Sequence, residues 1–125
     1  MKDGDITRQN MMGKLLAAIP EIKGRYNEES QWLDKDNTWV LCSFVLYRQI
    51  EALLMSDRPD EVQLRRIFDF LELLLSQQDL DVRNIVEDSV CENICSDEAV
   101  LQKAQRYMGA LAKEYCARYM GHAPQ

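Results

Sequence analysis

The chain has very few of the residues from which most active sites are built. It contains one histidine in 125 residues, His122, in a closing Gly-His-Ala-Pro-Gln stretch where few contacts could orient an imidazole. Catalytic arrangements that need a buried histidine beside a nucleophile are therefore excluded. The sequence also has no glycine-rich phosphate loop, no Gly-x-Ser-x-Gly elbow and no metalloprotease motif. We expect His122 to be a solvated tail residue and the chain not to be an enzyme.

Long apolar runs are absent as well. The longest candidates, around Trp39 to Leu46 and Phe70 to Leu75, are far shorter than the roughly 18 to 20 residues that cross a bilayer. The opening residues lack the basic segment, apolar stretch and cleavage site of a secretory signal. These features predict a cytoplasmic protein without a membrane segment.

Positive charge is scarce. Fifteen Lys and Arg residues face 21 Asp and Glu, which gives a net charge of -6, and Arg65-Arg66 is the only adjacent basic pair. Such a surface repels a phosphate backbone, so we expect no direct binding of nucleic acid. A protein partner with a basic surface fits the sign of the charge.

The four cysteines do not form a recognisable metal site. Cys91 and Cys95 share one face of a predicted helix, but a soft metal ion would need two further ligands. Cys42 and Cys116 do not form paired Cys-x-x-Cys knuckles with them. Because the cysteines lie in helical segments of a chain without an export signal, we expect reduced, structural thiols. No metal and no cofactor are predicted.

The residues that are abundant favour helices. Val, Ile and Thr, which favour strands, are few beside Leu, Ala, Met, Glu, Gln and Arg taken together, and no sustained alternation of apolar and polar residues indicates a strand. The sequence predicts an all-α fold: one domain over residues 1–125, a compact bundle of five to six helices. The predicted helices cover 6–18, 21–32, 38–55 and 61–75, followed by one after Asp81 that carries a buried stripe to Ile94, and a last one from Ser96-Asp97 to Gly121.

Helix caps and apolar stripes support these boundaries. Asn37 or Thr38, Asp60 and Asp81 are placed to cap the third, fourth and fifth helices. The clearest stripe lies in 61–75, where apolar residues repeat with helical spacing. The aromatic residues are expected mainly in the core; they are Trp32, Trp39, Phe44, Tyr47, Phe68 and Phe70.

One stretch resembles a HEAT-like helical hairpin. Arg66-Ile67-Phe68-Asp69-Phe70-Leu71-Glu72-Leu73-Leu74-Leu75-Ser76 is followed by Asp79-Leu80-Asp81-Val82-Arg83-Asn84-Ile85-Val86. An apolar helix, a short loop and an Asp-x-Asp-Val-Arg start to a second helix recur in that pattern. The resemblance implies an antiparallel hairpin. No second copy is present, so a long solenoid is not expected.

The same stretch, continued by Glu87-Asp88-Ser89-Val90-Cys91-Glu92-Asn93-Ile94, also resembles small helical bacterial proteins of polymorphic toxin systems, among them immunity proteins of contact-dependent inhibition. The opening Leu15-Leu16-Ala17-Ala18-Ile19-Pro20-Glu21 fits them too. The resemblance implies a protein that binds one cognate toxin domain, often a nuclease, and blocks its active site or substrate groove.

The acidic residues supply a physical reason for such a partner. A nuclease presents a cationic groove, and an acidic helical surface can occupy it. We expect the contact on the exposed side of the fifth helix and its adjoining loops; the candidates are Asp81, Glu87, Asp88, Glu92, Asp97 and Glu98. For each of them a solvated or helix-capping role is the competing interpretation. A helical adaptor or regulatory domain without a toxin partner is the alternative function, and an enzyme ranks third.

Overall fold

A computed structural model of the chain describes residues 5–122, and the side chains of residues 5–120. Over this range the regular structure is entirely helical, which confirms the all-α prediction. The elements are α1 (Met11–Ala18), η1 (Pro20–Ile22), α2 (Lys23–Glu29), α3 (Thr38–Leu41), η2 (Cys42–Tyr47), α4 (Arg48–Leu54), α5 (Glu61–Leu75), α6 (Leu80–Val86), η3 (Glu87–Cys91), α7 (Glu92–Ser96), α8 (Glu98–Ala104) and α9 (Ala110–His122).

Two of these helices contain an internal π-helical segment. The segment η2 joins α3 to α4 in one continuous helix over 38–54, and η3 joins α6 to α7 over 80–96. Counted in this way, the described residues form seven helical stretches, against the five or six predicted. The two π-helical segments pack against each other in the core. There Ser89 of η3 donates a hydrogen bond from its hydroxyl to the Ile85 carbonyl one turn earlier.

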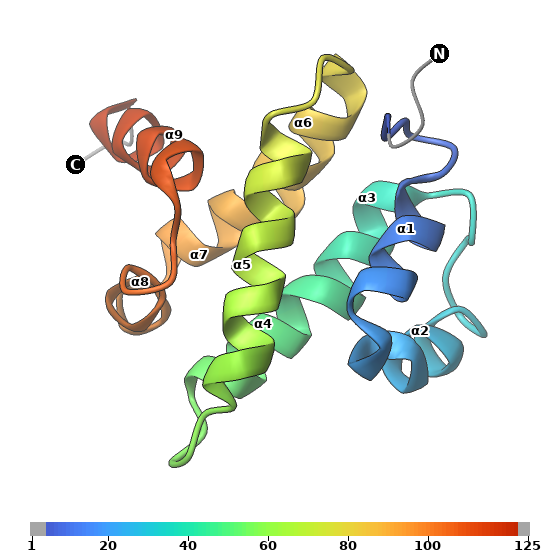
Figure 1. Cartoon of the computed structure of the whole chain (residues 1–125), viewed down its shortest axis with the longest axis horizontal. Coiled ribbons are helices and arrows are strands. Elements are labelled where there is room, and N and C mark those ends of the chain that lie inside the picture. Colours follow the sequence, from blue (N-terminus) through green and yellow to red (C-terminus); the bar gives the residue numbers. More distant parts are fainter. Residues whose placement is uncertain (1–4, 123–125) are drawn as a thin grey trace.

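The helices are arranged around α5, which crosses the middle of the molecule (Figure 1). The N-terminal pair α1 and α2 lies on one side of α5, and α8 and α9 lie on the other. The chain then doubles back after α5, and α6 packs against it. The largest fully buried side chains come from both halves of the chain; among them are Met11, Leu15, Leu46, Phe68 and Leu71.

The middle of the chain folds as predicted. Helix 38–54 starts at Thr38, and the Asn37 side chain accepts a hydrogen bond from the Val40 N–H at 3.1 Å. The helix α5 spans the predicted residues, and the Asp60 side chain accepts from the Gln63 N–H at 3.0 Å. Each cap satisfies a backbone donor that the first helical turn leaves unpaired.

Three predicted boundaries in the first half of the chain and at α6 were wrong. The first helix begins at Met11 and not at Ile6, because the Asn10 side chain accepts from the Thr7 N–H and holds a turn there. The second ends at Glu29. The cap of α6 is Asp79, whose carboxylate accepts from the N–H groups of Asp81 and Val82, so Asp81 lies inside the first turn.

The predicted last helix is broken in two. The helix α8 ends at Ala104, and α9 starts at Ala110 after a connector over 105–109 whose last residue is Gly109. Because of this break α9 returns to pack against α5 and α7, as Figure 1 shows. The helix α9 runs to His122, whose side chain lies outside the described residues, as does the predicted solvation of that side chain.

The assignment of aromatic residues to the core was correct for only part of the set. Phe68 and Tyr47 are buried, and Trp39 and Phe70 pack partly buried against the core. Trp32 is 81% exposed because α2 ends before it, and Phe44 is 41% exposed on helix 38–54. Phe44 therefore presents an aromatic ring on the surface of the protein.

Candidate functional site

The six predicted partner-binding carboxylates are spread along helix 80–96 and the start of α8. Asp81 and Asp97 lie at opposite ends of that helix, and a rise of ~1.5 Å per residue places them roughly 24 Å apart. They therefore do not form one patch. Three of the six stay together in its middle: Glu87, Asp88 and Glu92.

The outer carboxylates have structural roles at helix ends. One Asp97 oxygen accepts hydrogen bonds from the N–H groups of Ala99 at 3.1 Å and Val100 at 3.2 Å, which caps α8. Glu98 and Asp81 lie in the first turns of α8 and α6, where a negative charge is favourable beside the helix dipole. Capping of α8 is therefore a sufficient role for Asp97, and no binding partner is needed to explain this residue.

Two tyrosines from α9 lie beside the central carboxylates. Tyr115 stacks on Tyr119 with ring centroids 6.1 Å apart. Burial and, after it, the negative charges of Glu92, Asp88 and Glu87 in that order together raise the pKa of Tyr115 to about 12. A charge effect on Tyr115 requires these carboxylates to be close to its phenol. We call Glu87, Asp88, Glu92, Tyr115 and Tyr119 the acidic–tyrosine face.

The carboxylates of this face have no ion-pair partner within the described part of the chain. The ion pairs found there join Arg48 to Glu51, Arg66 to Glu21 and Arg106 to Glu61. Arg118 lies against the tyrosines of this face, with its guanidinium carbon 5.9 Å from the centre of the Tyr115 ring. The face therefore combines negative charge that is not neutralised with half-buried aromatic surface.

A groove adjoins the acidic–tyrosine face. It has a volume of about 480 Å³ and lies between helix 38–54 and α7, with both carboxylates and aromatic rings in its walls; the lining residues are Ser43, Phe44, Tyr47, Arg48, Glu51, Asn93, Ser96 and Asp97. Ser96 connects the two regions, because its hydroxyl lies 3.1 Å from the Tyr119 hydroxyl. Burial raises the pKa of Tyr47 to about 12, followed by the charges of Glu51 and Asp97. Tyr47 is thus a neutral hydrogen-bonding group at physiological pH.

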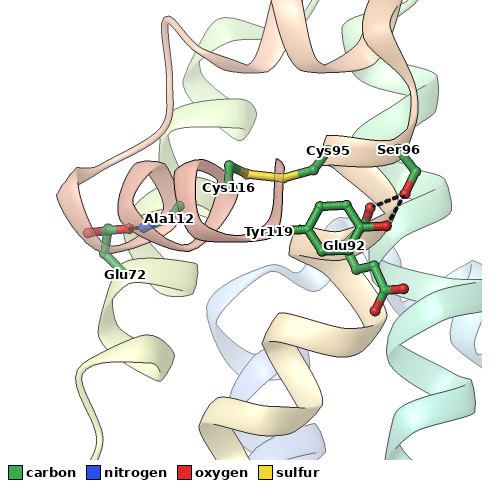
Figure 2. Close-up of a disulfide and its surroundings, with 7 residues drawn as sticks. All are labelled: Glu72, Glu92, Cys95, Ser96, Ala112, Cys116 and Tyr119. Atoms are coloured by element: carbon green, nitrogen blue, oxygen red, sulfur yellow. Dashed lines mark hydrogen bonds between the residues drawn. A yellow bond between two sulfur atoms is a disulfide. The ribbon is translucent and has the colours of Figure 1, made fainter. Parts of the chain in front are cut away.

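A disulfide holds α9 in place. This disulfide joins Cys95 of α7 to Cys116 of α9 (Figure 2). The Cα atoms of the two cysteines are 5.8 Å apart. The prediction that all cysteines are reduced was therefore wrong for this pair. The pairing depends on the return of α9 toward α7, and spacing within a helix does not reveal such a reversal. Cys42 and Cys91 are free and buried, as predicted.

The first turn of α9 is anchored by a residue of α5. The two carboxylate oxygens of Glu72 accept hydrogen bonds from the N–H groups of Leu111 at 2.9 Å and Ala112 at 3.0 Å. Figure 2 shows the one from Ala112. These hydrogen bonds satisfy two backbone N–H groups that the first turn of a helix leaves unpaired, and they put a negative charge at a helix N-terminus. A Cβ atom at Gly109 would collide with the Glu72 carboxyl group, so glycine permits the close approach.

Replacing Gly109 therefore tests the anchor. We expect Gly109→Ala to displace the Glu72 carboxylate and to lower the free energy of unfolding by roughly 1 to 2 kcal/mol, the usual value of a lost N-cap. Thermal unfolding followed by circular dichroism measures the change. The matched control is Gly24→Ala, because a Cβ there meets no atom within 4 Å and alanine is the better helix former. An equal gain in stability for both variants would contradict the proposed anchor.

A family model described as Domain of unknown function (DUF7674) matches residues 12–121 of the chain. The chain belongs to this family. No match was found among curated proteins or solved structures. The part of the chain that corresponds to the DUF7674 domain includes the whole acidic–tyrosine face and both cysteines of the disulfide. Those features thus belong to the domain itself.

The remaining groups of this DUF7674 domain that carry perturbed pKa values do not form a reactive cluster. Burial raises the pKa of both Cys42 and Cys91 to about 12; the neighbouring Ser89 side chain opposes the shift at Cys42, and the charges of Glu87 and Glu72 reinforce it at Cys91. Such thiols stay protonated and are poor nucleophiles. Within residues 5–122 no group of three or more potential ligands could hold a metal ion. Nor does any helix there combine the length and apolar character needed to cross a membrane.

Proposed function

We propose that this protein is an immunity protein, which binds a cognate toxin domain and blocks its active site or substrate groove. The toxin has a basic surface and is a nuclease. The observation that carries the proposal is the acidic–tyrosine face, where three carboxylates without ion-pair partners among the described residues surround Tyr115. The function is binding and not catalysis.

The chemistry of this surface suits a basic protein. Unpaired carboxylates attract a cationic groove over a distance and raise the association rate. Tyrosine provides a large, rigid contact area and a hydroxyl group, and for this reason it is enriched at interfaces. The adjoining groove contributes Phe44, an exposed aromatic ring beside Glu51 and Asp97. A guanidinium or ammonium group of the partner would find both a carboxylate and a ring there.

The packing of α5 against α6 supports the HEAT-like hairpin as the scaffold of this surface. The connector between α5 and α6 is short, so the two helices are neighbours in the fold. Helix 80–96 carries the three carboxylates at positions outside its buried stripe. The protein does not bind nucleic acid directly, because its net charge of -6 opposes a phosphate backbone. The proposed location is the cytoplasm, where a nuclease toxin would meet its substrate.

Co-expression with the toxin domain encoded beside the gene tests the function. The protein should rescue growth and form a one-to-one complex, whereas an adaptor would give no protection. Reversing two charges with Asp88→Lys and Glu92→Lys should weaken binding by roughly 100-fold or more at low salt, because attraction is replaced by repulsion. The salt dependence of the remaining binding should also fall. Isothermal titration calorimetry at two salt concentrations measures both changes.

The control variant carries the same change in net charge elsewhere. Glu28→Lys with Asp36→Lys alters two exposed carboxylates on the N-terminal side of the molecule. We expect this pair to retain affinity within about threefold, an effect of long-range charge alone. Equal weakening by both pairs would show that net charge, and not the acidic–tyrosine face, governs the interaction. If both double variants bind the toxin with native affinity and restore growth, the contact lies elsewhere on the protein.

A further inference from the structure

The disulfide lies next to both tyrosines of the acidic–tyrosine face. Cys116 directly follows Tyr115, and Cys95 directly precedes Ser96, whose hydroxyl lies 3.1 Å from that of Tyr119. Figure 2 shows the sulfur bridge and the Ser96 to Tyr119 hydrogen bond side by side between α7 and α9. Any change in this bridge therefore acts on the position of the two rings.

The helix α9 has little apolar surface that could hold it in place without the bridge. Among its described side chains only Ala112 and Cys116 are buried, whereas α5 buries seven residues. Tyr115 and Tyr119 pack against the core only partly buried. Side-chain hydrogen bonds add the contacts from Leu111 and Ala112 to Glu72 and the one between Tyr119 and Ser96. Elements with few buried apolar contacts open at lower free energy than the core. The docking of α9 thus depends strongly on the disulfide.

One of the two disulfide-bonded cysteines lines an open pocket. Cys116 lines a space of about 270 Å³ between α8 and α9, and Cys95 does not. The wall is mainly apolar, with one positive charge; the lining residues are Leu101, Gln105, Met108, Lys113, Cys116, Ala117 and Met120. Lys113 can attract a thiolate, the reactive form in thiol–disulfide exchange. Both cysteines are buried, with 8% exposure for Cys95 and 5% for Cys116, and this pocket is where a small thiol can come next to Cys116.

We propose that the Cys95–Cys116 disulfide is a thiol-exchange site, attacked at Cys116 by a small thiol of the glutathione class, and that its reduction releases α9 and dismantles the acidic–tyrosine face. The loss of toxin binding on reduction rests on the proposed function. The exchange and the release of α9 do not, because they involve only this chain and the thiol.

The exchange proceeds in two steps that balance. A thiolate attacks the Cys116 sulfur in line with the bridge, the S–S bond breaks, and Cys95 leaves as a thiolate. A second small thiolate then attacks the small-molecule sulfur of the mixed disulfide, which frees Cys116. The two cysteines take up protons and become thiols, and the two small thiols are oxidised to one disulfide. The buried Cys91, four residues before Cys95, stays outside the reaction because it remains protonated.

Hydrogen exchange measured by mass spectrometry tests the release of α9. The native chain is held in glutathione redox buffers of increasing reducing strength, and the state of the cysteines is fixed by acid quench and alkylation. On reduction we expect amides of 110–120 to exchange at least tenfold faster, while those of α5 change less than twofold. The α5 amides are the internal control, because global unfolding would accelerate both regions. Unchanged exchange in 110–120 would overturn the proposal, and so would an equal rise in α5.

Brief exposure to reduced glutathione locates the attacked sulfur. Acid quench and peptide mapping should find the mixed disulfide on Cys116, at least fivefold above Cys95. A mixed disulfide mainly on Cys95 would overturn the assignment of the pocket. Toxin binding is then compared for the oxidised and reduced chain. If α9 is released but affinity is unchanged, the proposed function of the face fails while the exchange site stands.

Discussion

The free energy of unfolding should fall by about 4 kcal/mol between pH 9 and pH 11. In the folded protein burial raises the pKa of the Cys42 and Cys91 thiols to about 12, whereas an unfolded thiol titrates near 9.0. Between these values the folded state keeps a proton that the unfolded state has lost, so raising the pH favours unfolding. This stabilising contribution is complete below pH 9 and disappears as the pH approaches 12.

The size of the effect follows from proton linkage. Each thiol lowers the free energy of unfolding by up to about 1.4 kcal/mol per pH unit within this window. Two thiols together remove about 4 kcal/mol between pH 9 and pH 11, a large part of the 5 to 15 kcal/mol typical of a domain. Tyr47 and Tyr115 act in the same direction at higher pH, because their pKa values are also raised to about 12.

Urea unfolding at pH 7, 9, 10 and 11 measures the pH dependence, and a cysteine variant identifies its source. Cys42→Ala with Cys91→Ala removes both buried thiols and should flatten the dependence between pH 9 and pH 11 to that of the tyrosines alone. The variant loses some stability at pH 7 because two buried side chains shrink. The comparison therefore uses the slope with pH and not the absolute value. Equal slopes for the two proteins would show that the thiols are not protected in the folded state.

Patterns within single helices were enough to predict part of this fold. The apolar stripe of α5 and the caps Asn37 and Asp60 depend on contacts only a few residues apart along the chain, and the structure contains them. The cap of α6 was predicted wrongly as Asp81, because Asp79 and Asp81 are the same residue type two positions apart and the sequence pattern does not separate them. Asp79 caps because its backbone is extended while Leu80 is already helical.

The break before α9 could not be predicted in the same way. Apolar residues continue with helical spacing from Val100 to Met120, so the pattern indicated one helix. The start of α9 just after Gly109 is stabilised by Glu72, which is distant in the sequence and approaches only in the folded chain. The disulfide was missed for the same reason, since it requires the chain to reverse between Cys95 and Cys116.

The candidate site was likewise predicted only as far as one helix shows it. Glu87, Asp88 and Glu92 could be placed together because they lie within six residues of one predicted helix; Asp88 is exposed and the other two are half-buried. Tyr115 and Tyr119 were missed as their neighbours. Their spacing of four residues indicates a shared helix face, but it does not reveal that this face meets the acidic helix. That contact follows from the tertiary position of α9.

Reducing the disulfide should lower the free energy of unfolding by about 3 kcal/mol, the value that the chain-entropy model gives for a closed loop of this length. Cys95 and Cys116 are 21 residues apart in the sequence, and their bond restricts the unfolded chain. Urea unfolding with and without a phosphine reductant measures the loss. The measurement is cleanest in the Cys42→Ala, Cys91→Ala background, where the bridge is the only target of the reductant and no free thiol can exchange with it.

The dependence of the free energy of unfolding on urea concentration, taken from the same experiments, shows how the disulfide stabilises the protein. If it stabilises by restricting the unfolded chain, the reduced chain expands further on unfolding and exposes more surface, so its dependence on urea should become steeper. If it acted only by holding α9 onto the folded protein, partial release of α9 in urea would instead make the curve shallower. The control Cys95→Ala with Cys116→Ala should match the reduced protein and ignore the reductant. A loss below about 1 kcal/mol would mean that the Glu72 cap and the Ser96 to Tyr119 hydrogen bond hold α9 without the bridge.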